Sequence, residues 1–134
     1  MEKTYHGSCH CGTIRFEVVA DLSAGTQKCN CTICTKMRLW SQKVAPEALR
    51  LISGEAALAD YTYGNHVAHH FFCRHCGIRP FERVDLPPPR ATYLNVSVVC
   101  LDDLPVADLL AAPVRYEDGR HDAWDGVPDE VRHL

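Results

Sequence analysis

The sequence predicts a mainly β domain of short antiparallel strands, in which bound metal supplements a modest hydrophobic core. Three observations predict this fold class: apolar and polar residues alternate with a period of two in several short segments, helix signals are weak, and eight cysteines occur mostly in close groups. The chain has 134 residues, of which 46% are hydrophobic, so we expect a single domain over residues 1–134.

The first strand predictions rest on alternation and on turn residues. Residues 13–19 alternate polar and apolar side chains, which is typical of a strand with one face in water. Residues 49–52 form a short apolar run that ends at Ser53-Gly54. Residues 57–63 and 67–72 are separated by Gly64-Asn65, and this pattern predicts a β-hairpin.

The later part of the chain predicts two more strands. Residues 78–84 form one, which Pro80 would confine to an edge or a bulge. Residues 93–99 form the clearest one. We expect its apolar residues to point inward and its polar residues outward, the former being Leu94, Val96 and Val98 and the latter Asn95 and Ser97.

Helical and irregular segments complete the prediction. Residues 46–49 and 105–111 each suit only a turn or two of helix, with Asp103 near the second as a candidate cap. The prolines of residues 87–89 predict an extended loop, and the tail from Glu117 onward is expected to be mostly irregular.

Charge and hydropathy narrow the function classes. The formal net charge of -3 gives no overall attraction for nucleic acid or anionic membranes, so we expect neither as a partner. Residues 1–21 lack the apolar run of a signal peptide, and no segment approaches the roughly 20 apolar residues of a spanning helix. We therefore expect a cytoplasmic protein.

The cysteine spacing favours metal binding over structural disulfides. Seven of the eight cysteines occur in the close groups Cys9-x-Cys11, Cys29-x-Cys31-x-x-Cys34 and Cys73-x-x-Cys76. Close pairs are typical half-sites for zinc, whereas a disulfide framework is typical of exported chains. Cys100 stands alone at the end of an apolar segment, where a small buried side chain is the simpler interpretation.

Two of these groups would complete one closed site. In a strand, residues two apart face the same way, so Cys9 and Cys11 can direct both sulfurs at one ion. Residues 73–77 have the form of a metal knuckle, in which the closing glycine can take a positive φ angle. Together the two pairs predict a tetrahedral four-cysteine zinc site with a structural role.

The third group, Cys29, Cys31 and Cys34, supplies only three ligands. Three protein ligands and one exchangeable position are expected of a catalytic zinc ion. Three thiolates weaken zinc as a Lewis acid and favour a soft fourth ligand, so we hypothesise that this position receives a substrate thiol and stabilises its thiolate. Two zinc ions per chain are therefore predicted, one structural and one catalytic.

The alternative is that a side chain of the protein closes the third group, which would leave two structural sites and no chemistry. Neutral imidazole is a common fourth ligand of zinc. The candidates that lie near cluster cysteines in the sequence, or that carry a spare thiol, are His10, His69, His70, His75 and Cys100.

These groups resemble those of the glutathione-dependent formaldehyde-activating enzyme family, which includes centromere protein V. Nearly the whole chain takes part in the likeness, and three cysteine groups in this order are highly specific. The matching segments are residues 7–12, 14–18, 29–36, 51–54, 70–77, 95–96 and 100–102.

The resemblance implies a fold of the Mss4-like kind, with the structural zinc on Cys9, Cys11, Cys73 and Cys76. It places the catalytic zinc on the other group and implies carbon-sulfur lyase chemistry, in which a thiol such as glutathione adds to an aldehyde or leaves its adduct. Family enzymes commonly carry Arg-Arg, a small residue and glycine after the triple cluster, whereas residues 35–39 here are Thr-Lys-Met-Arg-Leu. This difference bears on which substrate binds. It does not bear on metal binding, because all seven cysteine ligands of the family pattern are present.

Under this interpretation three further residues have candidate roles. Lys36 and Arg38 could bind the carboxylates of glutathione, although solvated surface charge is the plainer interpretation of both. His70 could move a proton to the hydroxyl of the adduct, although a buried hydrogen-bonded histidine would fit the same pattern.

Two other functions compete with the enzyme. A binding or scaffold module like centromere protein V would use zinc only to hold its fold. A redox sensor would use the clustered thiols, but bound zinc would suppress their oxidation.

Overall fold

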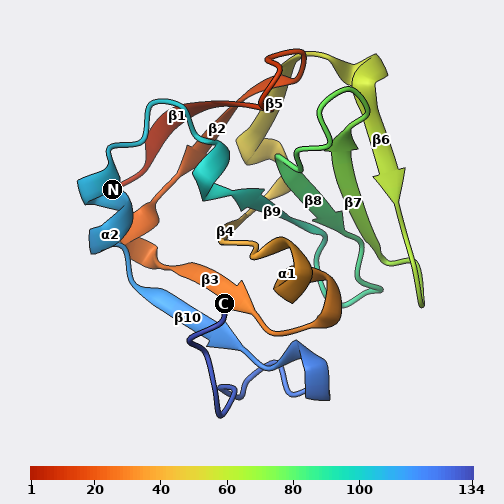
Figure 1. Ribbon diagram of the computed structural model, residues 1–134, viewed down its shortest axis with the longest axis vertical. Helices are drawn as coiled ribbons and strands as arrows, with labels where there is room; N and C mark the ends of the chain where they lie inside the picture. The colour runs from red at the N-terminus through yellow and green to blue at the C-terminus, as the bar shows by residue number, and fades with distance from the viewer.

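A computed structural model describes residues 1–134 and confirms a mainly β fold, built from two sheets (Figure 1). The smaller sheet has the order β1-β2-β5 and the larger one the order β10-β3-β4-β9-β8-β7-β6. All neighbouring strands are antiparallel except β10 and β3. The strands are β1 (Lys3–Ser8), β2 (Arg15–Ala20), β3 (Thr26–Cys29), β4 (Ser41–Val44), β5 (Leu49–Ser53), β6 (Leu58–Tyr61), β7 (Ala68–Cys73), β8 (Phe81–Val84), β9 (Tyr93–Ser97) and β10 (Val114–Glu117).

Helices are short and lie between strands. The two α-helices are α1 (Thr32–Met37) and α2 (Val106–Ala111). Single 3-10 turns are η1 (Leu22–Ala24), η2 (Pro46–Ala48), η3 (Glu55–Ala57), η4 (Val98–Cys100) and η5 (Gly119–His121). None of these helices has the length and apolar character that crossing a bilayer would require.

The main hydrophobic core lies between the two sheets. Phe16 of β2 meets Phe81 of β8 edge to face, with ring centroids 5.7 Å apart. Val96 of β9 belongs to the same buried cluster. The Phe16 ring packs directly on Gly7 of β1, where a Cβ atom would lie 2.3 Å from the ring. Only glycine therefore allows the ring to lie this close to the β1 backbone.

The two faces of the larger sheet differ in character because side chains alternate along each strand. One face presents Phe81 and Val96 to the core. The opposite face, which we call the outer face, carries the polar side chains of Gln27, Glu82 and Asn95, which hydrogen-bond to one another. Figure 1 shows α1 between β3 and β8. Because of these polar side chains, the outer face is the surface of the larger sheet on which a functional site can be built.

The predicted strands are confirmed, but several details are wrong. Residues 15–20 form β2, 49–53 form β5, the hairpin forms β6 and β7, 81–84 form β8 and 93–97 form β9, while residues 98–100 form the turn η4. Pro80 does not confine the strand after it to an edge, because it lies just before β8, which pairs with β7 on one side and β9 on the other. Asn95 and Ser97 are buried, not outward in water, because polar groups and neighbouring chain cover the outer face at the central strand β9. Asp103 caps no helix, because its carboxylate accepts hydrogen bonds from the backbone and ring of His6.

Candidate metal centres

The first group joins cysteines from distant parts of the chain. Cys9 and Cys11 lie in the turn after β1, not in a strand as expected, while Cys73 ends β7. Cys76 follows in the knuckle, and Gly77 takes the positive φ angle of 78° expected of it. The four sulfurs lie within 4.8 Å of one another. This group therefore connects residues that are more than sixty positions apart in the sequence.

The spacing of these sulfurs fits a metal ion and not a disulfide. The Sγ atoms of Cys9 and Cys11 are 3.6 Å apart, and those of Cys11 and Cys73 are 3.7 Å apart. A tetrahedron with metal-sulfur bonds of 2.3 Å has edges of about 3.8 Å. A disulfide bond would need about 2.05 Å. The four residues could therefore hold a metal ion in a closed site.

The protein environment acts on the thiols of this group in opposite directions. Burial raises the pKa of Cys9 to about 11. Hydrogen bonds from the backbone N–H groups of Cys11 and Ile78 lower the pKa of Cys76 to about 6. A positive ion would favour the thiolate form of every member.

The second group forms where β3 turns into α1. Cys29 is the last residue of β3, Cys31 immediately precedes α1, and Cys34 lies inside that helix. Their sulfurs lie within 4.8 Å of one another, and no histidine, carboxylate or further cysteine joins the group. This group could therefore also hold a metal ion, with three side-chain ligands from the chain.

The candidate fourth ligands lie elsewhere. His69 and His70 bond to carboxylates, and Cys100 faces the carbonyl oxygen of Arg79 at 3.8 Å. His10 and His75 are exposed next to the other cysteine group. The structure therefore brings none of the five candidates into the second group.

The start of α1 sets the protonation of the second group. Hydrogen bonds from the Cys29 and Cys34 thiols, together with backbone N–H groups of Cys34 and Ile33, lower the pKa of Cys31 to about 2. The hydrogen bonds with Cys29 and Cys31 raise the pKa of Cys34. Negative charge therefore concentrates on the Cys31 sulfur, which is half-buried.

One wall of this group is the segment around η5. A Cβ atom on Gly119 would lie 2.6 Å from the sulfur of Cys29 and 2.7 Å from the Trp124 ring. Asn30 holds the segment in place: its side-chain amide donates to Asp118 at 2.7 Å, and its side-chain oxygen accepts from the backbone N–H of Arg120 at 2.9 Å. The sulfur is thus enclosed by backbone on this side.

We expect Gly119→Ala to weaken metal binding at the second group selectively. The added methyl group must displace the Cys29 sulfur or the Trp124 ring, and neither residue belongs to the core between the sheets. Disturbing a support of a metal ligand typically costs about 10–100-fold in affinity. Zinc titration against a chromophoric chelator would measure the two affinities separately.

A matched control is Gly126→Ala in the same segment. Its Cβ atom would meet only Ala123, the carbonyl oxygen at 3.2 Å and the Cβ atom at 3.6 Å. This variant should bind both metal equivalents as the parent does. If Gly119→Ala weakened metal binding equally at both cysteine groups, the segment around Gly119 would not be a specific support of the second group.

His70 lies on the outer face in a buried polar network. Its ring is 4% exposed, and its Nδ1 atom is 2.8 Å from a carboxylate oxygen of Glu82. Arg79 donates to the same oxygen at 2.9 Å, and Asn95 donates to the other oxygen at 2.6 Å. The Tyr63 ring stacks on His70 with centroids 5.6 Å apart.

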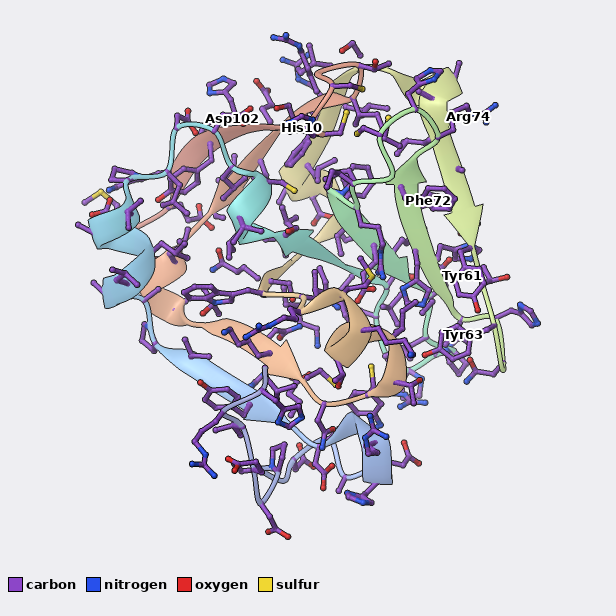
Figure 2. The ribbon with its side chains drawn as sticks, viewed as in Figure 1. His10, Tyr61, Tyr63, Phe72, Arg74 and Asp102 are labelled. Carbon is purple, nitrogen blue, oxygen red and sulfur yellow. The ribbon has the colours of Figure 1, made fainter.

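A shallow pocket of about 320 Å³ lies beside α1. Figure 2 shows Tyr61 and Tyr63 next to each other at its rim. The other lining residues belong to α1 and are Thr32, Ile33 and Lys36. Thr32 and Ile33 lie between Cys31 and Cys34 in the chain, so this pocket adjoins the second cysteine group, and burial raises the pKa of Tyr63. Arg38 ends α1 in a left-handed conformation and is exposed outside the pocket lining.

Sequence reasoning missed several residues of this region. Glu82, Arg79 and Gly119 are not singled out by the sequence, and Asn95 is expected to point into water, because their roles become visible only once distant segments lie together. The strand predicted over residues 78–84 does include Glu82, but nothing in the sequence places Glu82 opposite His70.

Comparisons with known proteins agree with this geometry. The family model described as glutathione-dependent formaldehyde-activating enzyme matches residues 4–115, which include both cysteine groups. A crystal structure of a Rhodobacter sphaeroides protein, a structural genomics target, is similar in fold, with a TM-score of 0.69 and 28% sequence identity. The similarity covers 82% of this chain and 99% of that one.

Proposed function

This chain belongs to the glutathione-dependent formaldehyde-activating enzyme family, and from that premise we propose that it is a zinc-dependent carbon-sulfur lyase. It would add a thiol such as glutathione to an aldehyde, or release the thiol from the adduct. We also propose that the chain acts as one domain over residues 1–134 and works in the cytoplasm, where a reducing environment keeps thiols free.

The observation that carries the proposal is the incomplete ligand set of Cys29, Cys31 and Cys34, to which no fourth side chain adds. A structural zinc site normally has four protein ligands, as the other group does. Zinc bound to the three sulfurs would supply positive charge that favours the thiolate of an incoming thiol.

The residues around the pocket have distinct proposed roles. Lys36 lines the pocket, where its ammonium group would attract a substrate carboxylate. Arg38, two residues further along at the C-cap of α1, would meet a second carboxylate of a longer substrate such as glutathione. In the addition, a carbon-sulfur bond forms, the carbonyl π bond breaks, and His70 would carry the thiol proton to the new hydroxyl oxygen.

A cobalt-substituted sample would test the proposal. We expect two metal ions per chain by native mass spectrometry. We also expect the visible spectrum of cobalt to change when glutathione is added, because a thiol entering the coordination sphere alters the ligand field. Lyase activity of the zinc form on a glutathione and formaldehyde mixture is the second measurement.

The alternatives predict different results. A scaffold module would hold two ions, leave the cobalt spectrum unchanged on adding glutathione, and have no lyase activity. One ion per chain would contradict the two-site scheme directly.

A further inference from the structure

We propose that Glu82 is a positioning residue that holds His70 in the tautomer with its proton on Nδ1 and thereby leaves Nε2 free as the proton-transfer atom. This inference rests on the proposed function. It assigns a role to a buried carboxylate that the cysteine groups do not explain.

Strand pairing places the two side chains in one row across the outer face. His70 of β7 lies opposite Glu82 of β8, and Glu82 lies opposite Asn95 of β9. On the other side of His70 its strand partner is Tyr61 of β6. Directly opposed residues point to the same face of a sheet, so the row is fixed by the backbone and not by side-chain choice.

Three atoms at the centre of this row determine where the proton lies. Nδ1 of His70, a guanidinium nitrogen of Arg79 and one oxygen of Glu82 lie 2.8–2.9 Å from one another. An unprotonated Nδ1 could accept a hydrogen bond from Arg79 at 2.8 Å, but its lone pair would also lie 2.8 Å from the negative oxygen of Glu82. A protonated Nδ1 donates to that oxygen, and the carboxylate then accepts from both His70 and Arg79. The second arrangement is the favourable one.

The network around Glu82 keeps this carboxylate ionised and fixed. Burial raises its pKa, but the hydrogen bonds from His70 and Asn95 and the positive charge of Arg79 outweigh burial and lower the pKa overall. Asn95 accepts in turn from Gln27 at 2.7 Å, and Gln27 lies two residues before Cys29 on the same strand. The row therefore runs from His70 to the strand that carries Cys29, the first cysteine of the second group. We call Cys29, Cys31 and Cys34 the open group, because only three side chains form it.

The other ring nitrogen of His70 is buried and has no partner in the chain. A buried polar atom without a hydrogen bond is costly, and such atoms in folded proteins call for an explanation. A substrate thiol or hydroxyl that donates to Nε2 would supply one. Tyr63 stacks on this ring and also lines the pocket beside α1, so the ring lies next to the proposed substrate position.

The groups facing His70 are Glu82, Arg79, Tyr61 and Tyr63. In the addition reaction Nε2 would take the thiol proton as the carbon-sulfur bond forms, and then give it to the former carbonyl oxygen. Nδ1–H remains bonded to Glu82 throughout, so no proton is gained or lost by the pair. In the release reaction the same steps run in reverse.

Nitrogen NMR of the zinc-loaded full chain tests the tautomer without any variant. Long-range proton-nitrogen spectra at a pH where His70 is neutral distinguish protonated from unprotonated ring nitrogens. We expect Nδ1 to be protonated and Nε2 unprotonated. The reverse tautomer as the main form would overturn the proposal, whatever the activity of the protein.

Glu82→Gln tests the consequence for catalysis. It keeps the size of the side chain and removes the charge that orients His70. We expect kcat to fall by about 100-fold, the scale of a general acid-base contribution, while KM stays within about twofold. The NMR spectrum of this variant should show an increased share of the other tautomer.

The neighbouring pair of His69 and Asp60 is a matched control. Its ring nitrogen and carboxylate are 2.6 Å apart, but His69 points to the opposite face of β7. Asp60→Asn should leave kcat and the His70 tautomer unchanged.

If Glu82→Gln folds, binds two ions and keeps the kcat of the parent, the positioning role is wrong. Absence of lyase activity in the parent would refute the proposed function, while the tautomer measurement would still decide the proton position.

Discussion

Chains carrying Cys73→Ser should fail to fold. Cys73 is fully buried in a cluster with Ile14 and Ala57, and its sulfur belongs to the group that ties the turn after β1 to β7. Structural zinc contributes about 10–16 kcal/mol in small zinc domains, which is comparable to the whole stability of a domain at about 5–15 kcal/mol. Loss of one of four ligands therefore removes most of what holds the fold. Circular dichroism and cooperative thermal unfolding would measure the effect.

The control for this experiment is Cys100→Ser. Cys100 is half-buried and belongs to neither cysteine group, so the same atomic change should leave a folded chain with two bound ions. We call Cys9, Cys11, Cys73 and Cys76 the closed group. If the Cys73→Ser chain unfolds cooperatively at the same temperature as the parent, the closed group does not stabilise the protein.

The Cys31→Ser variant should fold normally but lose its activity. Cys31 is half-buried on the side of the outer face, outside both hydrophobic clusters, so the core does not depend on it. Its sulfur is one of only three ligands that this group offers to a metal ion. A serine oxygen is a much poorer ligand for zinc than a thiolate, so this group should lose its ion. We expect one bound ion per chain, a melting temperature within a few degrees of the parent, and lyase activity reduced by at least about 1,000-fold.

Two results would separate the competing interpretations of the open group. Unfolding of the Cys31→Ser chain would mark this group as structural and favour the scaffold function. A folded chain with one ion and full activity would show that the chemistry takes place elsewhere. The same Cys100→Ser variant controls for a general effect of removing a thiol.

The sequence predicts the parts of the fold whose signal is local. The strand from residue 13 alternates cleanly, and the Gly-Asn turn announces the hairpin of β6 and β7. Cysteine spacing likewise predicts both groups, because a short turn is enough to bring paired sulfurs together. These predictions succeed because each depends on neighbours within a few positions.

The parts that are missed depend on distant partners. Residues 26–29 pair in parallel with 114–117, and four residues at each site carry too little periodicity to announce a strand. Helix α1 contains β-branched Thr32 and Ile33 and has no side-chain cap, so local propensity argues against it. Its first turn joins Cys31 to Cys34, which indicates that ligand geometry, not propensity, specifies this turn. Glu82 could not be linked to His70 before the pairing of β7 and β8 was known.

His70 and Cys73 both belong to β7 and are three positions apart. Because side chains alternate along a strand, His70 lies on the outer face and Cys73 on the opposite face. A slip of β7 by one position against β6 and β8 would exchange the two faces and turn this sulfur away from its three partners. Such a misfolded chain could not capture the ion that the closed group needs. A metal ion bound by Cys9, Cys11, Cys73 and Cys76 would therefore favour chains with correctly aligned strands, and in those chains His70 lies on the outer face.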